Sequence, residues 1–337
     1  MKEVVIKLTD KCPCKCSFCE SGNGKFANHQ EISDDYIMSF AEQLVRENLE
    51  ICVISGGEPL LRNGLANKLI DYLHSFGVYV VLNASGVLFI KKKLRDYLYN
   101  QPNLIVFSLD SCIEEKHDSH RGVSGLYAAI RNTIEDIHKI SNSSMSVGIR
   151  FVMTNLNYNE LDCMISLCAE WNVDCLKITN IENDSLGTYS LNANQCDDLF
   201  NRVLPNSINV LKRVAFENET LRLDGIKKMS SFMSGMSVSD MKSNLFFKNI
   251  AYNTECPLRS EFILVGGDGN IYPCCESEHH HYPILGNECI TDIKTVKKKL
   301  KDLRFNRLEF CKRCTLQRNI QINFTSNCLK VNDRCKQ

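Results

Sequence analysis

The chain lacks the features that would assign it to a membrane, to nucleic acid or to the secretory pathway. No apolar run approaches the roughly 20 residues that a membrane-spanning helix requires. The first residues, MKEVVIKLTD, form no signal peptide, because their apolar run is short and Lys7 interrupts it. Neither sign of charge is in excess, since 40 Lys and Arg balance 40 Asp and Glu. We therefore expect a cytosolic (cytoplasmic) protein with no nucleic-acid partner and no membrane partner.

Cysteine, in contrast, is abundant. The 337 residues include 18 cysteines, and 44% of the residues are hydrophobic, which is ordinary for a globular chain. Clustered cysteines in a cytosolic chain of this length more often bind metal or do redox chemistry than form disulfides. One group lies in residues 12–19 and another in 256–335. We expect the isolated cysteines to be small buried apolar residues: Cys52, Cys112, Cys163, Cys168, Cys175 and Cys196.

The first half of the chain alternates short β-rich runs with amphipathic helical patterns. Six repeats of this kind predict a parallel α/β fold, in which catalytic groups follow the carboxyl ends of the strands. The predicted strands are 4–9, 51–56, 78–83, 104–110, 146–154 and 175–181. The predicted helices between them are 33–48, with Ser33 as N-cap, 65–77, which ends on a glycine, 125–140 and 159–171.

Three cysteines follow the first predicted strand with the spacing C-x3-C-x2-C: Cys12, Cys16 and Cys19. Thiolates so close in sequence can surround one metal centre at a small entropic cost of loop closure. A [4Fe–4S] cluster usually takes four cysteines, so three ligands leave one iron open to an outside ligand. The alternative is a zinc knuckle that takes a fourth ligand, for which Cys14 is available.

A second motif, Ser55-Gly56-Gly57-Glu58-Pro59, follows the second predicted strand. Together with the three cysteines, and with Phe18 before the third, it resembles the radical S-adenosylmethionine (radical SAM) enzymes, whose GGEP motif it matches. This resemblance covers residues 3–185 and implies a partial (βα)6 TIM-like barrel. Weaker matches follow in the family's order: Asn83-Ala84-Ser85-Gly86, Ser108-Leu109-Asp110 and Arg121-Gly122.

The resemblance implies roles for these residues. Cys12, Cys16 and Cys19 would bind three irons of a [4Fe–4S] cluster, and the fourth iron would bind S-adenosyl-L-methionine. Reductive cleavage of that cofactor would give a 5′-deoxyadenosyl radical that takes hydrogen from a substrate, while Cys14 has no role. Gly56 and Gly57 would approach the methionine and Glu58 would hold its ammonium, or else cap the next helix. Further candidates for cofactor or substrate contacts are Ser55, Asn83, Ser85, Ser108, Asp110 and Arg150.

The C-terminal region is rich in cysteine. We expect residues 1–185 to form the barrel core, 186–255 a helical and connecting segment with a polar link at 230–244, and 256–337 a small α+β extension. In the extension, Gly267-Asp268-Gly269 predicts a β-hairpin turn between FILVG and NIYPC. The run His279-His280-His281 is expected in an exposed polar loop.

This region resembles the SPASM or twitch extension of radical SAM enzymes, which implies an auxiliary [4Fe–4S] cluster. The resemblance assigns its four ligands as Cys256, Cys274, Cys311 and Cys314, and a zinc site is the alternative. The cysteines held in reserve as ligands are Cys275, Cys289, Cys328 and Cys335. The two-cluster pattern of the family is broken here, because LQRNIQINF follows Cys314.

The extension favours modification of a ribosomally made peptide, by crosslink, thioether formation or epimerisation. The alternative is radical oxidation, decarboxylation or rearrangement of a small molecule such as a sugar or nucleoside. Expected partners of this oxidoreductase are an electron donor such as flavodoxin or ferredoxin and a separate leader-peptide-binding protein. We expect no leader-binding domain before the first strand. A non-enzymatic iron–sulfur or zinc protein is the remaining alternative.

Overall fold

A computed structural model describes residues 1–22, 24, 31–140, 145–181, 188–234, 261–279, 281–287, 292–303 and 320–331. The chain forms two compact units, each made of two stretches of sequence. The first unit is Met1–Val106 with Cys256–Leu308, and the second is Phe107–Glu255 with Glu309–Gln337. These units do not follow the three expected segments, whose boundaries stay a prediction. Each unit is described by itself.

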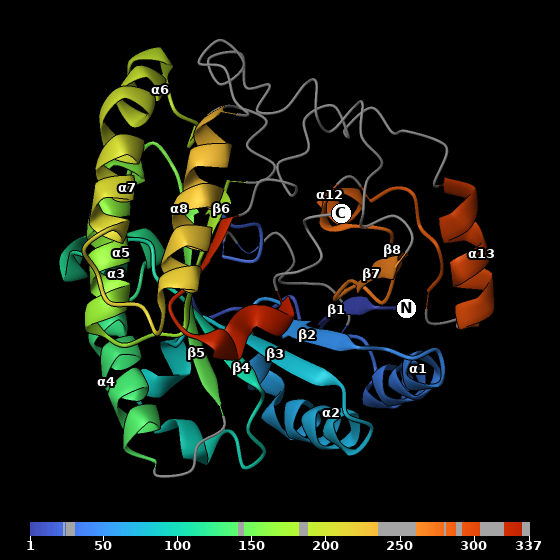
Figure 1. Ribbon diagram of the computed structural model, residues 1–337. Coiled ribbons are helices and arrows are strands. Elements are labelled where there is room, and N and C mark those ends of the chain that lie inside the picture. Colours follow the sequence, from blue (N-terminus) through green and yellow to red (C-terminus); the bar gives the residue numbers. More distant parts are fainter. Residues whose placement is uncertain are drawn as a thin grey trace. The chain divides into compact units, whose positions relative to one another are not determined.

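The first unit begins with three parallel strands and the helices that follow them (Figure 1). Strand β1 pairs with β2 in the register Val5↔Val53, and β2 pairs with β3 in the register Val53↔Val81. The Ser33 side chain caps the first long helix by accepting from Tyr36 N at 3.2 Å, as expected. In order, the elements are β1 Glu3–Lys7, α1 Asp34–Arg46, β2 Ile51–Ser55, η1 Pro59–Arg62, α2 Asn63–Ser75, β3 Tyr79–Ala84, η2 Val87–Ile90 and η3 Leu94–Asp96.

The C-terminal hairpin belongs to this unit. Strand β7 (Phe262–Val265) pairs antiparallel with β8 (Ile271–Tyr272), which confirms the predicted hairpin. On its other edge β7 pairs in parallel with β1, so that the strand order is β8-β7-β1-β2-β3. The sequence did not indicate this pairing. Two helices complete the unit, α12 Cys275–His279 and α13 Ile293–Leu303.

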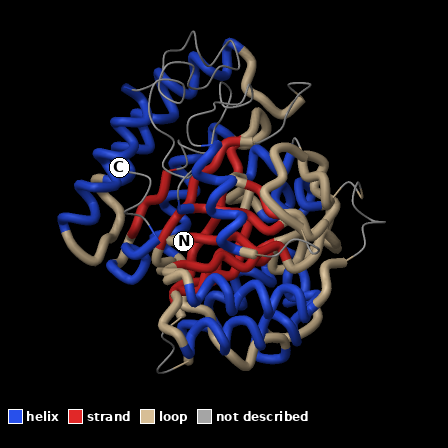
Figure 2. The backbone as a smooth tube through the Cα atoms, turned by 90° about the vertical axis from the view of Figure 1, so that its right-hand side faces the viewer, coloured by secondary structure: helices blue, strands red, loops and turns tan. Residues whose placement is uncertain are grey.

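The second unit follows β4 (Leu104–Ser108), the strand in which the chain passes from one unit to the other. Strand β6 lies between a parallel neighbour, β5, and an antiparallel one, β9. Figure 2 shows strands in red with helices in blue against them. In order, the elements are α3 Glu114–Arg121, α4 Leu126–Lys139, β5 Ser146–Met153, η4 Tyr158–Glu160, α5 Leu161–Glu170, β6 Cys175–Asn180, α6 Ala193–Asp198, η5 Leu199–Val203, α7 Leu204–Leu211, α8 Glu219–Ser234, β9 Ile320–Asn323 and η8 Ser326–Val331.

The predicted α/β fold class is confirmed, with all six strands and the four helices between them in place. One local expectation is wrong, and one helix was not predicted. The polar link at 230–244 begins inside α8, which continues to Ser234. The short helix α3 was not predicted, because it is charged throughout and has no apolar stripe to reveal it. Within the described ranges, no helix is both apolar and long enough to cross a bilayer.

Candidate functional site

The cysteine loop, residues 12–19, begins five residues after Lys7, where β1 ends. Cys16 and Cys14 are buried, with exposed fractions of 3% and 1%, while Cys12 and Cys19 are partly exposed. Inside the loop, Cys19 N donates to Cys16 O at 3.1 Å. Gly22 packs so closely that a Cβ there would lie 2.8 Å from Cys16 N. The backbone around Cys16 is therefore held in place.

The Gly-Gly-Glu turn after β2 binds the base of this loop through the backbone. Gly57 N donates to Thr9 O at 2.7 Å, and Glu58 N donates to Lys11 O at 2.8 Å. A Cβ on Gly56, whose φ is 136°, would lie 2.3 Å from Thr9 O, and one on Gly57 would lie 2.3 Å from Lys11 O. The two glycines thus allow one backbone to approach another. Their predicted contact with a methionine stays a prediction.

Glu58 is buried, with an exposed fraction of 1%, and its carboxylate joins the turn to the end of β3. Its Oε1 accepts from Leu60 N at 3.1 Å. Glu58 therefore caps the following helix, η1, which was one of the two roles predicted for it. Its Oε2 accepts from Ser85 N at 2.8 Å and also from Ser85 Oγ. Burial raises the pKa of this carboxyl group, although the hydrogen bonds from Ser85 and Leu60 oppose the rise. The ammonium contact of Glu58 stays a prediction.

The structure brings together the site residues predicted in the first unit. Asn83 Nδ2 donates to Ser55 Oγ at 3.5 Å, which joins the ends of β3 and β2. Ser85, 7% exposed, follows β3 and meets Glu58. The group that gathers around the cysteine loop and the Gly-Gly-Glu turn is Cys12, Cys16, Cys19, Ser55, Gly56, Gly57, Glu58, Asn83 and Ser85.

The other predicted site residues lie in the second unit. Asp110 is fully buried, and its Oδ2 lies 2.6 Å from Arg121 Nε. The backbone N of Asp110 donates to His117 Nδ1 at 3.1 Å. Burial, and then the nearby Arg121 charge, lower the pKa of His117 to about 4. Ser108 ends β4 half-buried, and Arg150 is half-buried on β5. Their contacts with a cofactor or substrate stay predictions.

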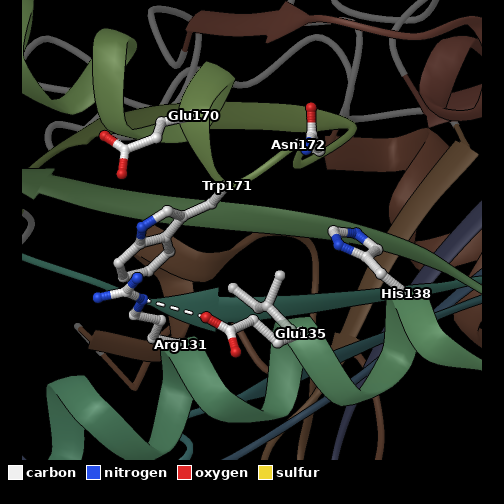
Figure 3. Close-up of a pocket in the computed structure, with 7 residues that line it drawn as sticks. Arg131, Glu135, His138, Glu170, Trp171 and Asn172 are labelled. Carbon is white, nitrogen blue, oxygen red and sulfur yellow. Dashed lines mark hydrogen bonds and ion pairs between the residues drawn. The ribbon is translucent and has the colours of Figure 1, made fainter.

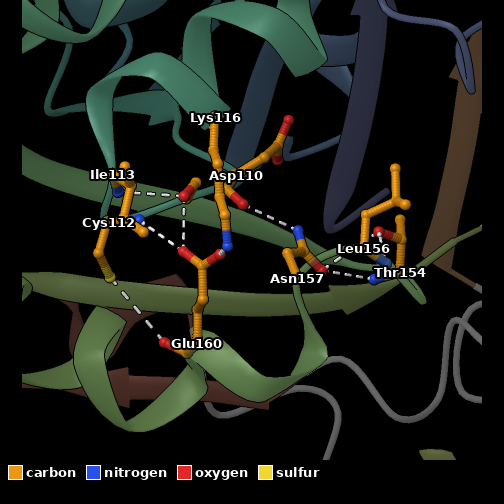
Figure 4. Close-up of polar contacts among 9 residues, drawn as sticks. Asp110, Cys112, Ile113, Lys116, Thr154, Leu156, Asn157 and Glu160 are labelled. Atoms are coloured by element: carbon orange, nitrogen blue, oxygen red, sulfur yellow. Dashed lines mark hydrogen bonds and ion pairs between the residues drawn. The ribbon is translucent and has the colours of Figure 1, made fainter.

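Figure 4 shows a network that the sequence did not reveal. Asn157 Nδ2 donates to Asp110 O at 2.9 Å, and its Oδ1 accepts from Thr154 N at 2.7 Å. Glu160 Oε2 accepts from Ser111 Oγ at 2.5 Å, and its Oε1 lies 3.0 Å from Lys116 Nζ. The available signal was Asn157, which lies just before the helix predicted at 159–171, where an asparagine side chain often binds turn backbone. The network fixes the segment after β4 to the segment after β5.

The second unit also contains a small pocket of about 150 Å³ between α4 and the end of α5 (Figure 3). Its lining residues are Arg131, Ile134, Glu135, His138, Glu170, Trp171 and Asn172. Trp171 is 9% exposed and packs edge-on against Tyr127. Ligand pockets usually measure about 300–1,000 Å³, so this one is too small to enclose a nucleoside cofactor or a peptide.

Only one of the four predicted auxiliary ligands, Cys274, lies in the described residues; Cys256, Cys311 and Cys314 fall outside them, as do Cys289 and Cys335. Cys274 Sγ lies 3.2 Å from Ser277 Oγ, and Cys275 begins α12. Cys328 of the reserve set is buried in the second unit, where its thiol hydrogen-bonds Cys175.

The prediction that isolated cysteines are buried holds for Cys52, Cys168, Cys175 and Cys196. It is wrong for Cys163, which is exposed because it lies on the solvent side of α5, and for Cys112, which is only partly buried. The histidine run is also corrected in part. His279 ends α12 half-buried, His281 is exposed, and His280 lies outside the described residues.

Among the described residues, no three Cys, His, Asp or Glu side chains converge on a single metal ion. A [4Fe–4S] cluster places its cysteines on separate irons, so its ligand sulfurs need not meet at one point. The cysteine loop fits such a cluster in two respects. Its thiols share one short loop. In addition, the Gly-Gly-Glu turn holds the base of that loop.

The sequence model of the Radical SAM superfamily matches residues 6–168, a segment that contains the cysteine loop, the Gly-Gly-Glu turn and the Asp110 network. The match covers just under half of the chain, and the matched segment resembles the radical SAM superfamily, whose members use a [4Fe–4S] cluster and S-adenosylmethionine. Cys12, Cys16 and Cys19 are the residues that would hold the cluster.

Curated relatives are distant. Fe-coproporphyrin III synthase of Methanosarcina barkeri is 25% identical over 167 residues, which are 50% of this chain and 41% of the relative. The GTP 3′,8-cyclase of Helicobacter pylori is 24% identical over 316 residues, which are 90% of this chain and 89% of the relative. The match to the first of these spans less than half of that relative's length.

Two solved structures share the fold. Streptococcus suis SuiB, bound to its precursor peptide SuiA, superposes with a TM-score of 0.63 at 15% identity, over 93% of this chain and 70% of SuiB. The enzyme anSMEcpe with bound AdoMet also gives a TM-score of 0.63, at 19% identity, over 94% of this chain and 87% of its own. This likeness confirms the partial-barrel fold class.

Proposed function

We propose that the chain reductively cleaves S-adenosylmethionine and uses the resulting radical to modify a ribosomally made peptide. The observation that carries this proposal is the cysteine loop with its base bound to the Gly-Gly-Glu turn. The cluster and S-adenosylmethionine, when bound, supply a 5′-deoxyadenosyl radical that removes a hydrogen atom from the substrate. The chain itself holds the three thiols, excludes solvent from Cys16 and fixes the neighbouring strand ends.

The peptide substrate is favoured by the likeness to SuiB bound to a precursor peptide and to anSMEcpe bound to the Cp18Cys peptide. The C-terminal hairpin with Cys274 also supports it, because the chain resembles peptide-modifying enzymes with a SPASM or twitch extension. We further propose one auxiliary [4Fe–4S] cluster on Cys256, Cys274, Cys311 and Cys314, a cytoplasmic location, and flavodoxin or ferredoxin as electron donor. A separate protein would bind the peptide's leader.

A second candidate is chemistry on a nucleotide or another small molecule. The match to GTP 3′,8-cyclase over 90% of this chain favours it. The two candidates share the cofactor chemistry and differ in the molecule that donates the hydrogen atom.

The test is anaerobic. The full chain is reconstituted with iron and sulfide and given dithionite and S-adenosylmethionine, and 5′-deoxyadenosine is measured by mass spectrometry. We expect product from the native chain and none from Cys16→Ala, because that variant lacks one cluster ligand. A native chain with a filled cluster and no product would contradict the cleavage reaction.

The substrate is then tested with S-adenosylmethionine and deuterated candidates. Deuterium in 5′-deoxyadenosine from a peptide encoded beside the gene supports the peptide proposal. Deuterium from GTP or another nucleoside, and none from the peptide, would overturn it in favour of the second candidate.

A further inference from the structure

The residues on either side of the cysteine loop contact one short C-terminal segment, Gly266–His279, which we term the clamp segment. Before the loop, Lys7 Nζ lies 2.7 Å from Glu278 Oε2. These side chains are only 22% and 13% exposed. Burial alone would lower the pKa of Lys7, but the Glu278 carboxylate raises it above its usual value. The ion pair is therefore a largely buried joint between β1 and α12.

The second contact involves Asp10, two residues before Cys12. Asp10 is 8% exposed, and its carboxylate packs directly on the backbone of Gly267 in the hairpin turn. A Cβ on Gly267 would lie 2.4 Å from Asp10 Oδ1 and 2.5 Å from its Cγ. No side chain at position 267 is compatible with this approach, so the contact depends on glycine.

The third contact follows the loop. Glu20, directly after Cys19, places its Oε2 3.5 Å from Nδ1 of His279 at the end of α12. The clamp segment also packs on the hydrophobic core. Its Cys274 and Cys275, together with Val5 of β1, contact the cluster formed by Phe262, Leu264 and Tyr272. The clamp segment, which consists of the hairpin turn, β8 and the short helix α12, thus contacts the chain both before and after the three thiols.

We propose that the clamp segment fixes both ends of the cysteine loop, and that Lys7, Asp10, Gly267 and Glu278 are positioning residues for the cluster ligands. These contacts add to the bonds with the Gly-Gly-Glu turn, which lie before Cys12. The inference concerns how the thiols are held. It stands whether the substrate is a peptide or a small molecule, and it is tested on the chain without its cofactors.

The experiment measures thiol exposure in the full chain freed of iron by a chelator under anaerobic conditions. Alkylation by a maleimide is followed for single cysteines by mass spectrometry. Cys16, which is 3% exposed, reports on the loop. Cys52, fully buried in β2, reports on global unfolding, and the exposed Cys163 marks complete reaction. The variants are Gly267→Ala and Glu278→Gln, with Gly64→Ala as control because a Cβ at Gly64 meets nothing within 4 Å.

We expect Gly267→Ala to speed the alkylation of Cys16 at least about tenfold while Cys52 stays protected, since a shift of about 1.4 kcal/mol in a local opening equilibrium has that effect. Asp10→Ala alone, which removes the same contact without adding an atom, should also speed the alkylation of Cys16 while Cys52 stays protected. If Gly267→Ala unfolds the chain, the test rests on Glu278→Gln, which adds no heavy atom. The deciding quantity is then the alkylation rate of Cys16 relative to that of Cys52. Unchanged protection of Cys16 in Glu278→Gln and in a folded Gly267→Ala would overturn the proposal.

Discussion

Arg121 Nε lies 2.6 Å from Asp110 Oδ2, and both side chains are buried, 9% and 1% exposed. This ion pair joins the C-terminal end of α3 to the segment after β4. Removing one member of such a pair leaves an uncompensated charge in the interior, whereas replacing both members with apolar groups costs far less.

Arg121→Met should therefore destabilise the chain by about 3–5 kcal/mol, measured by urea unfolding of the cofactor-free protein. The exposed pair Arg131–Glu135 on α4 provides the control, and Arg131→Met should cost less than about 0.5 kcal/mol. The double variant Asp110→Leu with Arg121→Met should be more stable than Arg121→Met alone. Equal losses at positions 121 and 131 would contradict this account.

A pH dependence follows from His117, whose pKa falls from an ordinary 6.5 to about 4 in the folded chain. Below pH 6.5 the unfolded chain binds a proton that the folded chain does not, so stability is complete above pH 6.5 and declines as the pH falls toward 4. The decline attributable to this residue is about 3 kcal/mol. His117 Nδ1 accepts from Asp110 N, and protonation of that nitrogen would remove the bond.

The measurement compares the free energy of unfolding between pH 7 and 4.5 in the native chain and in His117→Asn. The asparagine oxygen can still accept from Asp110 N but does not titrate. We expect a shallower pH profile in the variant. Parallel profiles would show that other groups cause the acid lability.

The close approach of Gly57 to Lys11 predicts that a larger residue at position 57 lowers both stability and iron binding. A Cβ there would lie 2.3 Å from Lys11 O, so Gly57→Ala must displace the backbone just before Cys12. Overpacking of this kind costs about 1–3 kcal/mol, and we also expect less iron to be bound after anaerobic reconstitution. Gly64→Ala in α2 should instead stabilise the chain by about 0.4–1 kcal/mol. Thermal unfolding and iron content distinguish the two variants, and full iron binding by Gly57→Ala would count against the role of the turn.

Cys14 offers a test within the cysteine loop itself. It is buried, 1% exposed, but falls outside the C-x3-C-x2-C spacing. Cys14→Ser should retain the N-terminal cluster, whereas Cys16→Ser should lose it, as judged by iron content and visible absorption. Loss of iron in Cys14→Ser to the extent seen in Cys16→Ser would favour a site with four cysteine ligands, such as the zinc alternative.

Local patterns predicted most of the fold. The apolar runs predicted all six strands, and Gly267-Asp268-Gly269 predicted the hairpin, because strand periodicity and turn chemistry depend on neighbouring residues. The pairing of β7 with β1 and of β9 with β6 could not be predicted in this way. Those contacts join distant parts of the chain, and no short pattern specifies which strand edge a later segment will meet.

The site was predictable to a similar extent. Spacing and order identified Cys12, Cys16, Cys19 and the Gly-Gly-Glu turn. They did not predict the backbone hydrogen bonds that join the turn to the base of the cysteine loop. The approach of Gly56 and Gly57 to a ligand stays a prediction, and their approach to the backbone of residues 9–11 in the structure was not predicted. The contact of Asp10 with Gly267 was not foreseeable either, since it depends on tertiary packing between the two ends of the sequence.

The pairing of Glu3 with Phe262 and of Ile6 with Val265 has a consequence for biosynthesis. Strand β1 leaves the ribosome before its β7 neighbour, which is made roughly 10–50 seconds later at ordinary elongation rates. During that interval one edge of β1 has no native partner, and an unpaired apolar edge is prone to pair with another chain. Nascent copies of this protein should therefore depend on chaperones, or on slow and cool expression, until β7 has emerged.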